Sequence, residues 1–344
     1  MAVMWPFGKR DEATATELRA LRQELRALRH DVVMLREVIE QVRGGQKVLR
    51  DLAAGQKNDG KWRSIFRRQL GALVRLQYLA ARVPAPEALL ARRFRLRSQN
   101  EEDGIVLALL DAVGVTRRRF VEIGSGGTGG NSAVLAYDMG WSGMMIEASA
   151  RGAAVARELF RHNPGVTVLQ KFATADNVNS LLRHATDDDP EVDLMSIDVD
   201  SVDYWLLDAL NTKVCRPRVL VLEYNAHFGP TRAVTVPNGP VPAHAPKSYF
   251  GASLAALTRA ARRKGYRLVA CEPSGINAFF VRKDLAPELS TLKPAQAYRP
   301  MVRRIASDED IPYVEDVYAL AAARGLPIVD LDAETPPVPT PTPA

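Results

Sequence analysis

FVEIGSGGTGGNSA, residues 120–133, carries an apolar run into a turn with five glycines and then into a segment with helical character. Glycines let the backbone pass close to a bound molecule, and the first turn of a helix offers free N–H groups. Gly124, Gly126 and Gly129 satisfy the pattern GxGxxG, which by itself fits NAD as well as other nucleotide-containing cofactors. The stretch therefore predicts a strand, a turn and a helix arranged around a cofactor.

Further apolar runs follow this stretch, separated by segments that suit helices. The expected parallel strands are 119–123, 144–146, 166–170, 194–197 and 218–222, and the expected helices are 131–139, 150–162, 177–184 and 202–212. Such alternation predicts a parallel α/β sheet with right-handed crossovers. Residues 266–271 and 277–281, joined by a short Pro-Ser-Gly turn, are expected to form a hairpin that makes one edge of the sheet antiparallel.

The N-terminal part of the chain has a different composition. Residues 11–54 carry four heptads of apolar a and d positions, namely Leu18, Leu21, Leu25, Leu28, Val32, Leu35, Ile39 and Val42. This pattern predicts a coiled coil that joins copies of the chain. An amphipathic helix packed on its own domain is the alternative.

Residues 61–97 hold ten Lys or Arg and a single acid, Glu87, among aromatic and aliphatic residues. We expect a basic helical segment that packs on the next domain or lies on an anionic surface, such as the inner face of a membrane. Nucleic acid is disfavoured, because no nucleic-acid-binding module surrounds the segment. The remaining boundaries are expected at 98–290 for the α/β domain, 291–332 for a helical extension and 333–344 for a disordered Pro/Thr tail.

The composition is that of an ordinary globular protein, with 47% hydrophobic and 25% charged residues. No apolar run approaches the roughly 20 residues of a membrane span, and no secretory signal opens the chain, so a cytoplasmic location is expected. Cys215 and Cys271 lack the spacing of a zinc site, and buried free thiols are expected.

Two acids separate the cofactor candidates. Glu122 lies two residues before the first glycine, where the pyrophosphate of a dinucleotide would disfavour a carboxylate. The ammonium and sulfonium groups of S-adenosylmethionine would favour one. Glu147 ends the second expected strand, where an acid binds ribose hydroxyls with either cofactor. The pair favours S-adenosylmethionine, and an NAD-dependent oxidoreductase is the weaker alternative.

Polar residues also end the fourth and fifth expected strands: Asp198, Asp200, Glu223, Asn225 and His227. The carboxyl ends of parallel strands share one edge of the sheet, so these side chains are expected to converge. In one hypothesis Asp198, Glu223 and Asn225 hold Mg²⁺, which orients an acceptor hydroxyl and lowers its pKa. In the other no metal is present, and His227 or one of the acids is the general base.

Segments spread over residues 98–285 resemble, in order, FkbM-like S-adenosylmethionine-dependent methyltransferases. They are SQNEEDG at 98–104, FVEIGSGGTGGNSA at 120–133, GWSGMMIEAS at 140–149, DLMSIDVDSVDYW at 193–205, VLEYNA at 221–226, YFGASL at 249–254 and INAFFV at 276–281. The resemblance implies a Rossmann-like class I methyltransferase fold. It also implies O-methylation, often of a sugar hydroxyl in a polysaccharide, glycolipid or glycosylated natural product.

The resemblance further implies roles for single residues. Glu122, Gly124 and Gly126 would cradle the methionine part of S-adenosylmethionine. Glu147 would bind the ribose, and Asp198 would contact the methionine end or a metal.

Other residues would complete the cofactor pocket. Thr174, Ala175 and Asn177 fall where the edge of the adenine is usually bound. Gln99 and Asp103 precede the first core strand and would help close the pocket. The turn itself is richer in glycine than is usual in the family.

The sequence thus favours an O-methyltransferase that acts on a glycan or another hydroxyl-bearing molecule. A scaffold protein with a vestigial methyltransferase domain is the alternative. Loops 226–250 and 286–330 are expected to determine the choice of acceptor, and the first is stiffened by its prolines.

Overall fold

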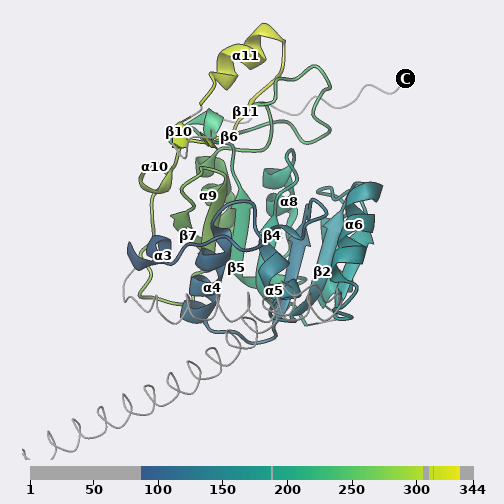
Figure 1. Cartoon of the computed structure of the whole chain (residues 1–344). Coiled ribbons are helices and arrows are strands. Elements are labelled where there is room, and N and C mark those ends of the chain that lie inside the picture. The colour runs from purple at the N-terminus through teal and green to yellow at the C-terminus, as the bar shows by residue number, and fades with distance from the viewer. Residues whose placement is uncertain (1–86, 187–188, 305–309, 313, 334–344) are drawn as a thin grey trace, which may run out of the picture. The chain divides into compact units, whose positions relative to one another are not determined.

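The computed structural model describes residues 87–333 except 187–188, 305–309 and 313 (Figure 1). All of these belong to one compact unit, residues 83–344. The predicted coiled coil at 11–54, residues 61–86 of the basic segment and residues 334–344 of the tail lie outside the described residues. Within the described part, no helix is long and apolar enough to cross a membrane.

The core is a seven-stranded sheet with the order β3-β2-β1-β4-β5-β8-β7. Its strands are β1 (Arg119–Ile123), β2 (Ser142–Glu147), β3 (Val166–Gln170), β4 (Glu191–Ile197), β5 (Arg216–Glu223), β7 (Tyr266–Cys271) and β8 (Asn277–Arg282). Strands β1 to β5 are parallel, and β8 runs antiparallel to both β5 and β7. The predicted parallel sheet with an antiparallel edge hairpin is confirmed.

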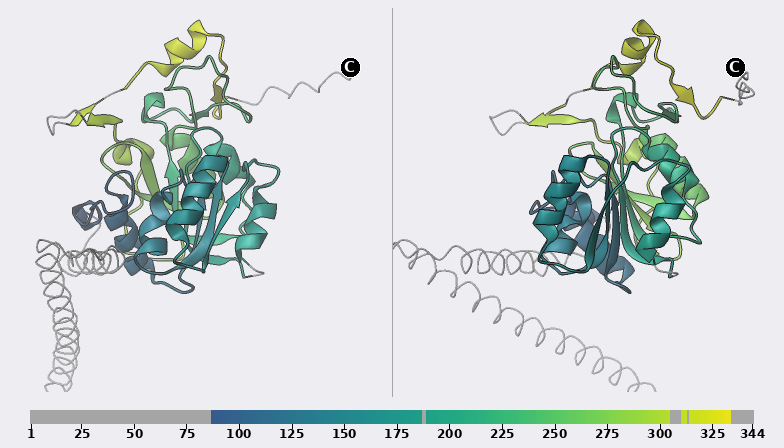
Figure 2. Two further views of the ribbon diagram at one scale, coloured as in Figure 1. Left: turned by 45° about the vertical axis from the view of Figure 1, so that its right-hand side comes forward. Right: turned by 90° about the vertical axis from the view of Figure 1, so that its right-hand side faces the viewer.

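Helices cover both faces of the sheet (Figure 2). They are α4 (Glu102–Val113), α5 (Ala133–Tyr137), α6 (Ala150–Phe160), α7 (Val178–Thr186), α8 (Asp203–Ala209) and α9 (Leu254–Arg263). Apolar residues of α7, α8 and α9 share one buried cluster with Val121 and Ile123 of β1. Because side chains alternate along a strand, Phe120 and Glu122 point to the opposite face. Glu122 therefore faces the glycine turn and the start of α5.

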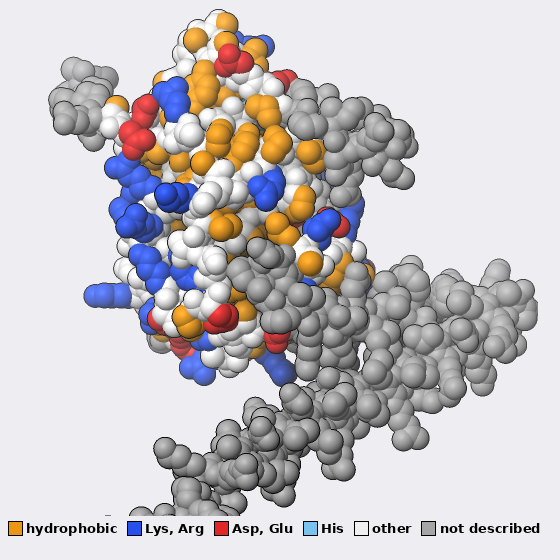
Figure 3. Space-filling model, turned by 90° about the vertical axis from the view of Figure 1, so that its left-hand side faces the viewer, with side chains coloured by type: hydrophobic (Ala, Val, Ile, Leu, Met, Phe, Trp, Pro, Cys, Tyr) orange, Lys and Arg blue, Asp and Glu red, His pale blue; other side chains and the backbone are white. Residues whose placement is uncertain are grey.

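The segment after β8 returns along the edge of the sheet. The Leu292 N–H donates to the Leu268 carbonyl at 2.9 Å, and the Arg267 guanidinium donates to carbonyls of residues 285, 286 and 289. These bonds cover part of the backbone of edge strand β7, which limits pairing with other chains. Figure 3 shows this side of the molecule, with hydrophobic side chains gathered on its upper half and Lys and Arg along one margin.

A small cap lies beyond the carboxyl ends of the parallel strands, at the top of Figure 1. It contains η2 (Ala226–Phe228), β6 (Val234–Thr235), α11 (Val317–Ala323) and β11 (Val329–Asp330). Strand β11 pairs with β6, and the cap has its own apolar cluster around Phe228, Tyr249 and Val317. The predicted helical extension at 291–332 is only partly helical, with α10 (Pro294–Ala297) and α11 separated by β9 (Val302–Arg304) and β10 (Asp310–Pro312).

Candidate functional site

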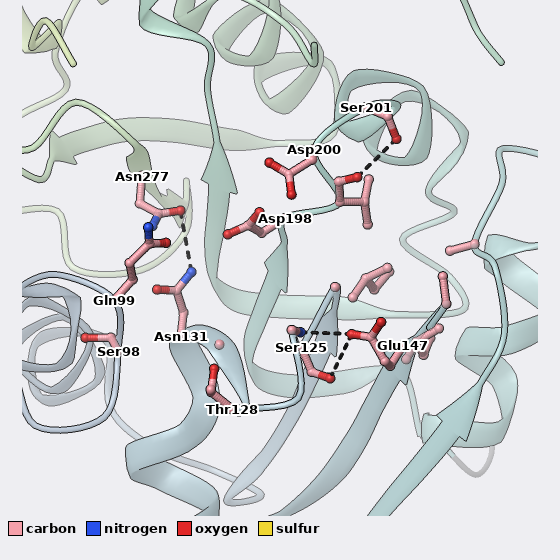
Figure 4. A pocket seen from close by; sticks show the side chains of 18 of the residues that line it. Ser98, Gln99, Ser125, Thr128, Asn131, Glu147, Asp198, Asp200, Ser201 and Asn277 are labelled. Carbon is pink, nitrogen blue, oxygen red and sulfur yellow. Dashed lines mark hydrogen bonds between the residues drawn. The ribbon is translucent and has the colours of Figure 1, made fainter. Parts of the chain in front are cut away.

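A cavity of about 530 Å³ opens at the carboxyl ends of β1, β2 and β4 (Figure 4). This edge is where open α/β sheets bind their ligands. The lining comes from Arg95 and residues 97–99 before α4, the turn after β1, residues 146–148 at the end of β2, residues 171–173 after β3, residues 198–202 after β4, and Asn277 of β8.

The glycines of the turn serve different purposes. A Cβ on Gly124 would lie 2.6 Å from the Asp198 carbonyl carbon, and a Cβ on Gly130 would lie 2.7 Å from Glu122 Cδ. Gly126 also has a positive φ, +57°, but no atom of the described residues lies within 4 Å of the place where its Cβ would be. Gly124 and Gly130 are therefore required by the packing of the chain itself. Gly126 leaves bare backbone beside the cavity.

Glu122 is fully buried and does not line the cavity. Its carboxylate accepts N–H bonds from Asn131 at 3.2 Å and Ser132 at 2.9 Å, and it also accepts the Ser132 hydroxyl. Burial raises the pKa of Glu122 to about 7, although these donors oppose the shift. The described geometry thus gives Glu122 the task of holding the start of η1 (Gly130–Ser132) and α5, rather than the predicted contact with a methionine group.

Glu147 lines the cavity as predicted, at the end of β2. Its Oε2 accepts the Gly126 N–H at 2.9 Å, and its Oε1 accepts the Ser149 N–H at 2.8 Å. The Ser125 hydroxyl donates to Oε2 at 3.4 Å (Figure 4). Each carboxylate oxygen retains lone-pair capacity for a further donor, such as a ribose hydroxyl.

Thr174, Ala175 and Asn177, which were predicted at the edge of the adenine, lie outside the cavity lining. The Thr174 N–H donates to Asn177 Oδ1 at 2.9 Å, and Asn177 Nδ2 donates to the Phe172 carbonyl at 2.9 Å, so these residues fold the loop before α7. The cavity is lined instead by Lys171, Phe172 and Ala173.

Phe172 was missed by the sequence reasoning. Phe172 is 58% exposed as a residue, although it lines the cavity. An exposed aromatic ring directly after a strand end suits a flat base. The signal available in the sequence was the aromatic residue two positions after the third strand.

Asp198, Asp200 and Glu223 come together, and each offers a carboxylate oxygen within 4.8 Å of the others. Asp198 and Asp200 line the cavity (Figure 4). Glu223 is 8% exposed, and no donor among the described residues hydrogen-bonds to its Oε2. Burial raises the pKa of Asp198 to about 7 and also raises that of Asp200. Burial and the neighbouring acids raise the pKa of Glu223.

Asn225 is used elsewhere. Its Oδ1 accepts the His227 N–H at 2.9 Å, and its Nδ2 donates to the Ser248 and Phe250 carbonyls at 2.8 Å each. Asn225 therefore ties the end of β5 to a distant loop. The structure does not support Asn225 as a metal ligand. The third acidic side chain beside Asp198 and Glu223 is that of Asp200.

His227 is buried in the cap and does not line the cavity. Its Nδ1 accepts the Glu315 N–H at 2.9 Å, and burial lowers its pKa. His227 thus connects η2 to the C-terminal segment. The geometry does not support it as the general base and leaves that role to the acids of the cavity.

A buried polar network that the sequence did not reveal supports one wall of the cavity. Asn131 Nδ2 donates to Ser196 Oγ at 3.1 Å. It also donates to Asn277 Oδ1 at 3.5 Å (Figure 4). Asn277 Nδ2 donates in turn to Glu102 Oε1 at 3.0 Å. The network links η1, β4, β8 and α4, so it fixes the position of two cavity-lining amides.

The segment before α4 is held by Asp103. One oxygen of this buried carboxylate accepts the N–H groups of Leu96, Arg97 and Ser98 at 2.6, 2.6 and 3.0 Å. Gln99 lines the cavity next to this loop. Gln99 is therefore placed as predicted, whereas Asp103 closes the pocket indirectly, by shaping the loop.

No family model matches the chain, and no curated protein matches it. Among solved structures, it is similar to the N-terminal domain of EvdMO1 with SAH bound, with 14% identity, 61% of this chain and 93% of that chain covered and a TM-score of 0.35. It is similar to a SAM-dependent methyltransferase from Aquifex aeolicus, with 14% identity, 58% and 97% covered and a TM-score of 0.32. Cofactor-bound Rv0187 from MTB is 19% identical, with 62% and 88% covered and a TM-score of 0.34.

These likenesses are too distant to transfer a function. The strand order, with β8 inserted antiparallel between β5 and β7, matches the Rossmann-like fold of class I methyltransferases. Any activity has to be argued from the residues of the cavity.

Proposed function

We propose that this chain is an S-adenosylmethionine-dependent methyltransferase that acts on a hydroxyl oxygen. The observation that carries the proposal is the position of Glu122. In dinucleotide-binding folds the pyrophosphate lies on the N–H groups that open the helix after the glycine turn. Here the N–H groups of Asn131 and Ser132 already bind the Glu122 carboxylate. Glu122 therefore disfavours NAD by filling the pyrophosphate site, and a cofactor without a pyrophosphate suits the turn.

The cavity fits the parts of S-adenosylmethionine. Its volume, about 530 Å³, lies within the usual range for small-molecule sites, roughly 300–1,000 Å³. The Glu147 carboxylate would accept the ribose hydroxyls, and the Phe172 ring would cover the adenine. The methionine part would lie beside the bare backbone of Gly126, toward Gln99 and Asp198.

When bound, S-adenosylmethionine supplies an activated methyl group, and the chain has to orient the acceptor and receive its proton. The acceptor oxygen forms a bond to the methyl carbon while the carbon–sulfur bond breaks, and the acceptor proton passes to a base. Asp198 suits that role because it lines the cavity and because burial raises its pKa above that of an ordinary aspartate, toward physiological pH.

A sugar hydroxyl of a glycan, glycolipid or glycosylated natural product is the acceptor class we propose, on the basis of the resemblance described above. The cap follows β5 directly and lies at the same edge of the sheet as the cavity, so its loops are suited to select the acceptor. Self-association through residues 11–54 and membrane contact through residues 61–97 remain predictions.

The direct test is a transfer assay with the full chain, methyl-labelled S-adenosylmethionine and a panel of glycosides, sugar nucleotides and glycolipids. We expect label in an ether linkage of one acceptor class, and we expect Asp198→Asn to abolish it. The matched control is Asp176→Asn, which changes an exposed acid before α7 and should keep full activity. Hydride transfer with NAD and no transfer of label would overturn the proposal.

A further inference from the structure

We propose that Asp198, Asp200 and Glu223 bind a divalent cation, Mg²⁺ or Mn²⁺, at the edge of the cavity. Cation binding does not require S-adenosylmethionine. The use of the cation in methyl transfer, however, rests on the function proposed above.

The three ligands come from two adjacent parallel strands. Asp198 and Asp200 directly follow β4, Glu223 ends β5, and the two strands pair in register up to Ile197 and Leu222. The carboxylate oxygens lie within 4.8 Å of one another. Oxygen ligands at about 2.1–2.5 Å from a cation are separated by roughly 3 Å when adjacent and 4–5 Å when opposite. The cluster therefore already has nearly the size of a cation site.

Glu223 provides an independent indication of a missing partner. More than nine-tenths of its surface is buried, yet among the described residues its Oε2 has no hydrogen-bond donor, and the side chain it meets within hydrogen-bonding reach is that of another acid, Asp198. Buried carboxylate oxygens are normally satisfied, so an oxygen left unpaired beside two other acids points to a ligand that carries positive charge.

In the part of the chain that the structure describes, no Lys or Arg forms a salt bridge with Asp198, Asp200 or Glu223. The nearby acid Asp203 is used differently, because its oxygens accept the N–H groups of Val199 and Ser201 at 2.9 and 3.1 Å. Asp203 thus shapes the loop that carries Asp200, while the other three acids remain available for a cation.

Three carboxylates leave an octahedral cation about three free positions. Since Asp198 and Asp200 line the cavity, these positions face the space where the acceptor would bind. With the cation bound, Asp198 acts as a ligand and not as the base. A hydroxyl bound to the cation loses its proton to solvent water more readily, and its oxygen then attacks the methyl carbon as the carbon–sulfur bond breaks. No electrons are exchanged with the cation.

The test measures Mn²⁺ binding to the metal-stripped full chain by electron paramagnetic resonance, without S-adenosylmethionine. We expect one Mn²⁺ per chain, at least tenfold weaker binding in Asp200→Asn and Glu223→Gln, and competition by Mg²⁺. Asn is well tolerated at the positive φ of Asp200, +55°, so the first variant keeps the backbone even if the buried Glu223 variant unfolds. Asp176→Asn is the matched control and should bind Mn²⁺ like the wild type.

No binding at millimolar Mn²⁺, or equal binding by wild type and Asp200→Asn, would overturn the cation site. If no Mn²⁺ binds, Asp198, Asp200 and Glu223 would share protons in place of a cation. A parallel titration with S-adenosylmethionine in excess EDTA separates the two proposals. Binding of S-adenosylmethionine without binding of Mn²⁺ would refute the cation site alone. Binding of Mn²⁺ without binding of S-adenosylmethionine would refute the proposed methyltransferase function.

Discussion

Gly130 should tolerate a methyl group far less well than Gly126, although both are in the same turn and both have a left-handed backbone. Their φ angles are +55° and +57°, so alanine at either position costs about 1 kcal/mol of backbone strain. In Gly130→Ala the new Cβ would also lie 2.7 Å from Glu122 Cδ. Glu122 is fully buried and holds three hydrogen bonds, so it cannot move without losing them. Overpacking of this kind adds about 1–3 kcal/mol.

Thermal unfolding of the full-length variants measures the difference. For a domain of this size 1 kcal/mol corresponds to about 2–4 °C, so about 3 kcal/mol predicts a Tm lower by roughly 6–12 °C for Gly130→Ala. Gly126→Ala should lose only about 2–4 °C. Gly126→Ala should nevertheless weaken S-adenosylmethionine binding, because its methyl group enters the cavity. Equal Tm losses in the two variants would refute the packing argument for Gly130.

Three further predictions concern other parts of the site. Burial raises the folded-state pKa of Glu122 to about 7 from its ordinary value of 4.5, so the protonated form is favoured in the fold and stability is lost as pH rises between these values. The free energy of unfolding of the wild type, relative to that of Glu122→Gln, should therefore fall by about 3 kcal/mol between pH 4.5 and 7. Urea unfolding measures both values, and a difference that stays constant with pH would contradict the burial argument. Phe172→Ala should weaken S-adenosylmethionine about tenfold without lowering Tm, because the exposed ring packs on little of the protein; an unchanged Kd in calorimetry would remove Phe172 from the adenine site. Asp103→Ala leaves three N–H groups without their acceptor, so limited trypsin digestion should cut after Arg95 or Arg97 faster than in wild type, and equal rates would show that another contact holds this loop.

The sequence predicted the sheet well because the relevant signals are local. Each buried parallel strand is a short apolar run, and Glu147 and Asp198 follow such runs directly. The carboxyl ends of parallel strands share one edge, so both acids could be placed at the cavity from the sequence alone. The two-residue period of a strand also places Glu122 on the face of β1 opposite to Val121 and Ile123.

The assignments that the structure does not support depend on contacts between distant segments. Asn225 is taken out of the acid cluster by carbonyls 23 and 25 residues away, and His227 is fixed by an N–H 88 residues away. In the network through Asn277, the partner residues are separated by 146 positions in one bond and by 175 positions in the other. No local pattern specifies such pairings, because they depend on how the cap and β8 pack.

Calorimetric titration of the full chain with S-adenosylmethionine, and separately with NAD, tests the central claim most directly. We predict micromolar binding of S-adenosylmethionine, no heat with NAD, and at least tenfold weaker binding in Glu147→Gln, because a carboxylate is the stronger acceptor for ribose hydroxyls. The Tm of Glu147→Gln, measured alongside, shows that the variant is folded. Binding of NAD in place of S-adenosylmethionine, or equal affinity in folded Glu147→Gln, would contradict the account.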